Sequence, residues 1–146
     1  MNKKNNLGFT LIELLLIIGL VSILGVMGAG VGGGMLGRNN VRVASDKLVV
    51  ALTTARSYAM SGREDSSWGV RVIPGAITTY KGASYAARDV AWDEEYSLAG
   101  TVDVSSQEVV FTKIVGEATP ASIPLSGPGG ASRTVTVSAL GLVEVQ

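Results

Sequence analysis

The order of hydrophobic and polar residues divides the chain into three successive regions. Residues 9–31 are almost wholly apolar, and Glu13 is the only charged residue between Phe9 and Arg38. Residues 38–61 repeat apolar positions at steps of three and four, and from Gly62 onward the apolar runs are short. A membrane-spanning helix needs about 20 apolar residues. We therefore expect a membrane helix, an amphipathic helix and a sheet region, which together make an α+β fold.

The amphipathic region at residues 38–61 is predicted to be a helix that packs one stripe against a core. The stripe comprises Val41, Ala44, Leu48, Ala51 or Leu52, Ala55, and Tyr58 or Ala59. Charged residues such as Arg42, Asp46, Lys47 and Arg56 mostly occupy the other faces, and Gly62 is the expected stop.

Six glycines among the ten residues 28–37 mark the preceding stretch. Each glycine costs about 0.8–1 kcal/mol relative to alanine in a helix interior, so we expect no stable regular helix there in water. Two interpretations stay open for this glycine-rich hinge. It is either a stretch that can unwind, or a small-residue face that allows close helix packing in a membrane.

Six short β-prone runs follow Gly62. They are residues 68–73, 76–81, 109–115, 122–125, 134–137 and 142–145. Breaks at residues 74–75, 127–130 and 139–141 leave no room for helical crossovers, so we expect antiparallel pairing. Val135, Val137 and Leu142 are expected to face the core of a hairpin. Residues 82–107 match no pattern that we can assign.

Two features distinguish the N-terminal residues. Lys3 and Lys4 precede the apolar region, and positive charge beside a first apolar segment stays on the cytoplasmic side of a membrane. Glu13 lies inside that region, where a carboxylate costs about 2.5–3.5 kcal/mol at a helix centre. The cost argues against a secretory signal or a plain anchor. Cleavage after Gly8 would give Glu13 a partner, because the new amine of Phe9 lies about one helical turn away.

Residues 8–14, GFTLIEL, resemble the class III signal of type IV prepilins and type II secretion pseudopilins. The resemblance implies that prepilin peptidase cleaves between Gly8 and Phe9. It also implies that Phe9 is then N-methylated and that Glu13 aids subunit docking. The distal runs WGVRV, VVF and RTVTVSALGLVEV resemble, less specifically, the pseudopilin H and fimbrial T type of minor pseudopilin, whose antiparallel sheets pack on a long helix.

From the resemblance we expect a leader peptide at residues 1–8, a transmembrane and filament-core helix at 9–37, and a globular pilin domain at 38–146. The expected function is that of a structural minor pilin or pseudopilin in a type IV pilus or type II secretion pseudopilus. Its single span would lie in the inner membrane, with the domain outside the cytoplasm. Expected partners are prepilin peptidase, other pilins in a helical filament and an inner-membrane assembly platform. A tip module that binds DNA, a surface or a secretion substrate is one alternative, and a major pilin is another.

Composition limits the chemistry open to the chain. The absence of cysteine and histidine removes disulfides, thiolate chemistry, cysteine-ligated zinc and the usual imidazole base or metal ligand. The glycine-rich runs lack the lysine and the strand-to-helix setting of a P-loop. We therefore expect no enzymatic activity and no cofactor. The 12 basic and 12 acidic residues balance, and loss of Lys3 and Lys4 would leave a slight acidic excess.

Two side-chain groups suggest other binding functions. Asp93, Glu94 and Glu95 are potential calcium ligands, but they lack EF-hand spacing, so we expect a solvated acidic loop. Trp68 and Trp92 could contact a partner, although large aromatic side chains more often fill a core, and we expect that here.

A nucleic-acid interface needs several converging cations. The candidate residues are Arg63, Arg71, Lys81 and Arg88. Only Arg133 is basic after Lys113, and the chain ends Val143-Glu144-Val145-Gln146. We therefore keep nucleic-acid binding as an alternative that the charge pattern does not favour.

Overall fold

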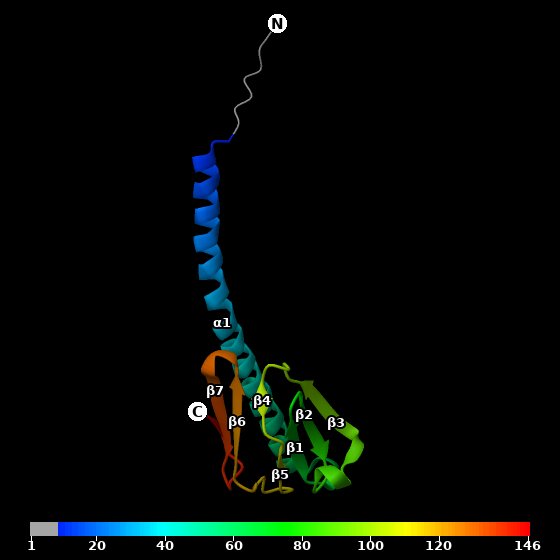
Figure 1. Cartoon of the computed structure of the whole chain (residues 1–146). Coiled ribbons are helices and arrows are strands. Elements are labelled where there is room, and N and C mark those ends of the chain that lie inside the picture. Colours follow the sequence, from blue (N-terminus) through cyan, green and yellow to red (C-terminus); the bar gives the residue numbers. More distant parts are fainter. Residues whose placement is uncertain (1–8) are drawn as a thin grey trace. The chain divides into compact units, whose positions relative to one another are not determined.

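The computed structural model describes residues 9–146, with the side chains of residues 25–33 outside the described part. Within these residues one long helix, α1 (Leu11–Met60), precedes two four-stranded antiparallel sheets (Figure 1). The predicted α+β class is confirmed. The chain divides into two compact units, Met1–Gly33 and Gly34–Gln146. Lys3, Lys4 and Gly8 lie outside the described residues.

Helix α1 continues through residues 28–37, so the expectation that this stretch lacks a regular helix is wrong for the chain as a monomer. Helix formation is cooperative, and turns that form on both sides of a glycine run spare it a new nucleation step. None of the helical residues that the structure describes forms a stretch with the length and hydrophobicity that a bilayer crossing requires. The transmembrane assignment of residues 9–37 stays a prediction.

From residue 34 onward, α1 buries the apolar stripe that its periodicity predicts. The stripe residues Val41, Ala44, Leu48, Ala51, Leu52, Ala55 and Ala59 are each at most 2% exposed. Gly62 ends the helix as predicted. Its φ of 65° lies in the left-handed region, and its amide donates a hydrogen bond to the carbonyl oxygen of Ala59 at 3.1 Å.

The strands of the second unit form two sheets. The first sheet has the order β3-β2-β1-β5 and the second the order β4-β6-β7-β8. Their bounds are β1 (Trp68–Ile73), β2 (Ala76–Lys81), β3 (Asp89–Ser97), β4 (Asp103–Val104), β5 (Gln107–Phe111), β6 (Ala121–Gly127), β7 (Ala131–Val137) and β8 (Val143–Val145). Short 3₁₀ turns lie at Arg63–Asp65, Tyr85–Ala87 and Pro128–Gly130. Every pairing is antiparallel, which confirms the predicted mode.

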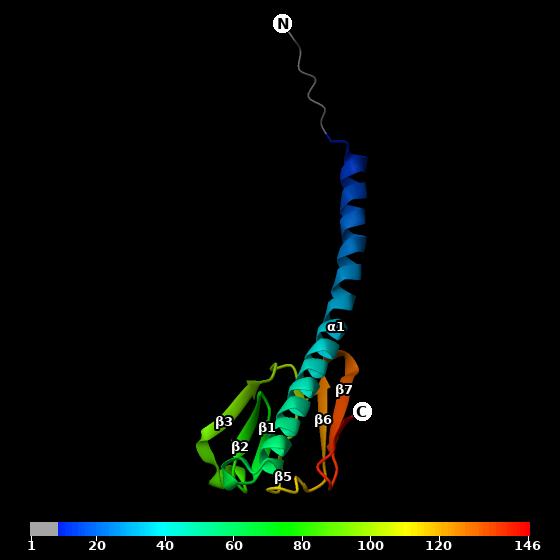
Figure 2. The same cartoon turned by 180° about the vertical axis from the view of Figure 1, so that it is seen from behind.

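The two sheets share one core with the second half of α1. Figure 2 shows this part of the helix running across both sheets, and one continuous cluster of buried side chains joins them. Trp68, Val70 and Phe111 come from the first sheet, and Ile123 and Val135 come from the second. One face of each sheet therefore packs against the helix, and in the first sheet the opposite face is free to carry polar groups.

The differences from the sequence prediction lie mainly in strand edges. The unassigned residues 82–107 contain β3, an acidic strand at the edge of the first sheet. Acidic residues are uncommon in strands, so the sequence did not predict one here. At a sheet edge, charged side chains hinder pairing with another chain. Strand β5 ends at Phe111 rather than at residue 115, because the chain turns from Thr112. The Gly116 amide donates to the Thr112 carbonyl oxygen at 2.8 Å, and Ile114 within this turn has a φ of 71°. Leu142, predicted to face the core, is 49% exposed, and Val143 packs against the core instead.

Candidate functional site

The N-terminal end of α1 is organised by Thr10. The hydroxyl oxygen Oγ1 of Thr10 accepts a hydrogen bond from the amide of Glu13 at 3.4 Å, and the Thr10 carbonyl oxygen accepts one from the amide of Leu14 at 3.2 Å. This places Thr10 at the N-cap and Glu13 at the third helical position, the spacing of a capping box. Thr10, the second residue after the predicted cleavage site, therefore defines where the helix begins.

The positions of Phe9 and Glu13 have an electrostatic consequence. The start of a helix carries a partial positive charge, which favours an acidic side chain in the first turn and disfavours an amine. Glu13 lies in that first turn, and Phe9 precedes the N-cap. Both side chains are exposed. A free amine on Phe9 would therefore need a nearby carboxylate, from its own Glu13 or from that of another chain.

Comparison with known families addresses the same segment. Residues 3–29 match the family model described as the prokaryotic N-terminal methylation motif. The motif supports a type IV pilin-like or pseudopilin-like precursor, a class of protein that prepilin peptidase processes and that assembles with other pilins. No curated protein and no solved structure matches the chain. The finer resemblance to the pseudopilin H and fimbrial T type stays a prediction.

Beyond the methylation motif, the four basic residues considered for a nucleic-acid interface are engaged within the protein. Three of them form ion pairs, namely Arg71–Glu108 at 3.4 Å, Lys81–Asp89 at 3.5 Å, Lys81–Glu64 at 3.6 Å and Arg88–Asp93 at 2.8 Å. The fourth, Arg63, lies over aromatic rings. Carboxylates thus compensate the charges of Arg71, Lys81 and Arg88 locally, which weakens the case for phosphate binding at these residues.

Arg63 connects the two tryptophans to α1. Its guanidinium carbon lies 4.1 Å from the ring centroid of Tyr58, 5.4 Å from that of Trp68 and 5.1 Å from that of Trp92. Trp68 is fully buried, which confirms its predicted place in the core, and Trp92 is half-buried against the core. Cation–π contacts of this kind fix Arg63 in place.

The acidic run at residues 93–95 lies in strand β3, so its assignment to a loop is wrong. Asp93 pairs with Arg88, Glu94 accepts a hydrogen bond from the Tyr58 hydroxyl at 3.3 Å, and Glu95 is exposed. Successive strand residues point to opposite faces, so the three carboxylates do not converge as calcium ligands must.

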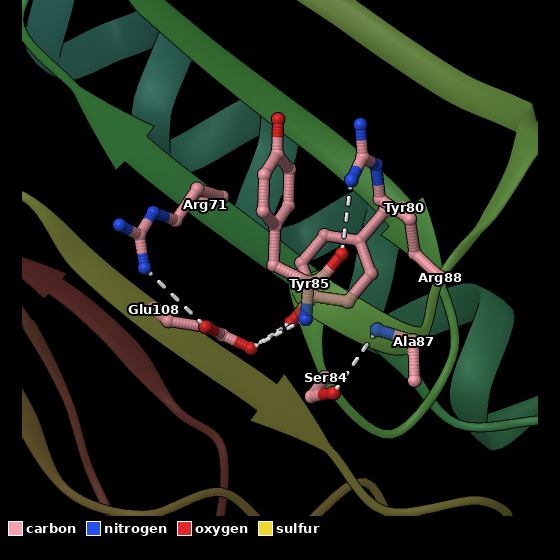
Figure 3. Close-up of polar contacts among 7 residues, drawn as sticks. All are labelled: Arg71, Tyr80, Ser84, Tyr85, Ala87, Arg88 and Glu108. Carbon is pink, nitrogen blue, oxygen red and sulfur yellow. Dashed lines mark hydrogen bonds and ion pairs between the residues drawn. The ribbon is translucent and has the colours of Figure 1, made fainter.

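A polar cluster that the sequence did not reveal centres on Glu108 of β5 (Figure 3). The Glu108 carboxylate accepts hydrogen bonds from the Tyr80 hydroxyl at 2.6 Å and from the Tyr85 amide at 2.8 Å, and it pairs with Arg71. Arg88 donates to the Tyr85 carbonyl oxygen at 2.9 Å, and its guanidinium lies 3.8 Å from the Tyr85 ring. The cluster holds the loop that contains Tyr85 against the sheet.

Strand register explains why these groups meet. Arg71 lies directly opposite Glu108, and Tyr80 lies opposite Gly69. A Cβ atom at Gly69 would come within 2.4 Å of the Tyr80 ring, so the ring can cross β1 only above a glycine. Only the pairing of β1 with β5 brings Arg71 and Glu108 together, and residue spacing along the chain does not show it.

The electrostatics of the cluster make it a fixed structural unit. Burial raises the pKa of the Tyr80 hydroxyl, and the hydrogen bond to Glu108 raises it further. Burial also acts to raise the pKa of Glu108, but the hydrogen bonds from Tyr80 and Tyr85 and the charge of Arg71 outweigh it and lower that pKa. The hydroxyl therefore stays a donor and the carboxylate stays an ionised acceptor near neutral pH.

Proposed function

We propose that this protein is a structural minor pilin or pseudopilin that is matured by prepilin peptidase and assembles into a type IV pilus or a type II secretion pseudopilus. The observation that carries the proposal is the match of residues 3–29 to the N-terminal methylation motif. The motif contains Gly8-Phe9 at the proposed cleavage site and Glu13 at the third position of α1. The domain that follows contributes packing surfaces rather than catalysis.

In the proposed sequence of events, the apolar region at residues 9–37 first holds the precursor in the inner membrane. Prepilin peptidase cleaves between Gly8 and Phe9, and Phe9 is N-methylated. The positive amine then lies at a helix start, where it is unfavourable unless a carboxylate is near. Glu13 of a neighbouring subunit meets this need when subunits pack, because a charge pair in apolar surroundings is far more stable than either charge alone.

The test compares maturation and filament incorporation in a host that supplies prepilin peptidase and the assembly machinery. Glu13→Ala is expected to be cleaved like the parent chain and to be lost from sheared filaments. Asp46→Ala is the matched control, because Asp46 is an exposed acid on the same helix with only a 4.0 Å ion pair to Arg42. The control should be incorporated normally.

A second variant separates charge pairing from helix capping. Thr10→Val removes the hydroxyl acceptor of the Glu13 amide but keeps the Glu13 carboxylate, at a cost of about 1 kcal/mol to the helix start. It should be incorporated better than Glu13→Ala. Normal incorporation of Glu13→Ala, or equal loss of both variants, would refute the proposed pairing.

A further inference from the structure

A recess of about 380 Å³ on the second unit collects three arginine side chains. Arg38 and Arg42 come from α1, one helical turn apart, and Arg133 comes from β7. The backbone near Gly130 and Ser132 completes the wall, and none of the described residues that line the recess is acidic. Arg42 and Arg133 are 91 positions apart in the chain, yet both line this recess. Their like charges repel each other there.

The charge of the recess is poorly compensated. Arg42 approaches Asp46 at 4.0 Å, but both side chains are largely exposed, and such pairs contribute little. In the described part of the chain, neither Arg38 nor Arg133 forms an ion pair. Arg71, by contrast, has a carboxylate partner. The recess is therefore a place where an external anion would relieve repulsion.

The chemistry of the walls favours a phosphate group. A guanidinium presents a planar set of donors that matches phosphate oxygens, often through two parallel hydrogen bonds. Three guanidiniums around one recess suit a single compact anion better than an extended polymer, whose phosphates need a row of cations.

We propose that the recess binds the phosphate of an anionic phospholipid headgroup. The inference rests on the proposed function, because it requires that the apolar region lies in a membrane before assembly. Arg38 is the first charged residue after Glu13 and directly follows residues 9–37, so it would reach the interface where lipid phosphates lie. Basic pockets beside membrane helices bind acidic headgroups in this way. The cationic choline of a neutral lipid would be repelled.

The experiment measures lipid retention by the purified full-length chain. Native mass spectrometry of the chain released from mixed micelles with equal phosphatidylglycerol and phosphatidylcholine should show preferential retention of phosphatidylglycerol. Arg133→Gln and, independently, Arg38→Gln should each reduce that retention about fivefold, as expected for one basic residue near an anionic surface. Lys113→Gln removes a cation paired with Asp65 away from the recess and should leave retention unchanged.

A second arm distinguishes the source of the phosphate. Thermal unfolding in neutral detergent is compared in inorganic phosphate and in chloride at equal ionic strength. Stabilisation by phosphate that Arg133→Gln abolishes, without preferential retention of phosphatidylglycerol, would show a free phosphate site and overturn the lipid assignment. Equal retention of both lipids with no phosphate effect would overturn the site altogether. Cleavage at Phe9 is measured separately, so a failure of lipid binding is not confused with a failure of the pilin function.

Discussion

Replacing Glu108 by alanine removes the acceptor of a buried hydroxyl. The Tyr80 hydroxyl donates to Glu108 at 2.6 Å, and Tyr80 is fully buried, so truncation leaves it without that partner. An unsatisfied buried polar group costs about 1–3 kcal/mol. Arg71 also loses its carboxylate at 3.4 Å, and the Tyr85 amide loses an acceptor that water can replace. We expect the free energy of unfolding to fall by about 2–4 kcal/mol in total.

Urea unfolding of the full-length chain in neutral detergent measures this change. Tryptophan fluorescence reports on the second unit alone, because Trp68 and Trp92, the two tryptophans of the chain, both lie in it. Tyr80→Phe provides the control. In that background no hydroxyl is left unpaired, so Glu108→Ala should cost about 1–2 kcal/mol less than in the parent chain. Additive effects, within about 0.5 kcal/mol, would refute the proposed hydrogen-bond coupling.

Three other perturbations test the fold. The pKa of Glu108 is lower in the folded state than in the unfolded state, where it is near 4.5. Glu108 therefore stabilises the fold above about pH 4.5, and this stabilisation is lost as the pH falls through the folded-state pKa. The urea concentration at the unfolding midpoint should decrease as the pH is lowered below about 4.5, and it should decrease less steeply in Glu108→Gln. Leu48→Ala should cost about 2–5 kcal/mol by urea titration because Leu48 is fully buried, whereas Val50→Ala, on an exposed face, should change stability by less than about 0.5 kcal/mol. Gly62→Ala should cost about 1–2 kcal/mol in the same titration, because alanine disfavours the left-handed conformation.

Local sequence patterns predicted the parts of the fold that depend on neighbours in the chain. The apolar stripe from Val41 to Ala59 follows helical spacing, and all of its predicted positions are buried or packed on the core. The turn at residues 74–75 was predictable because Pro74-Gly75 is a local turn signal. In the structure Ile73 and Ala76 pair across this two-residue connection, and Gly75 has a φ of 90°. The methylation motif was readable for the same reason, since its residues are contiguous.

Features that depend on distant residues could not be read in this way. Strand β3 is stabilised by its pairing with β2, although its acidic composition favours no strand. The Glu108 cluster requires the register that sets Arg71 opposite Glu108, and the arginine recess requires Arg133 to reach α1. The predicted loss of regular helix at residues 28–37 was wrong, because single-residue propensities do not include the cooperativity of a long helix.

The most direct test of the proposed function is the mass of the mature N-terminus. The chain is expressed with prepilin peptidase, recovered from membranes, and its N-terminal peptide is analysed by tandem mass spectrometry. We predict a chain that begins at Phe9 with one methyl group on its amine. A chain that retains Gly8, that begins at any other residue, or that carries an unmodified Phe9 amine would contradict maturation as a pilin.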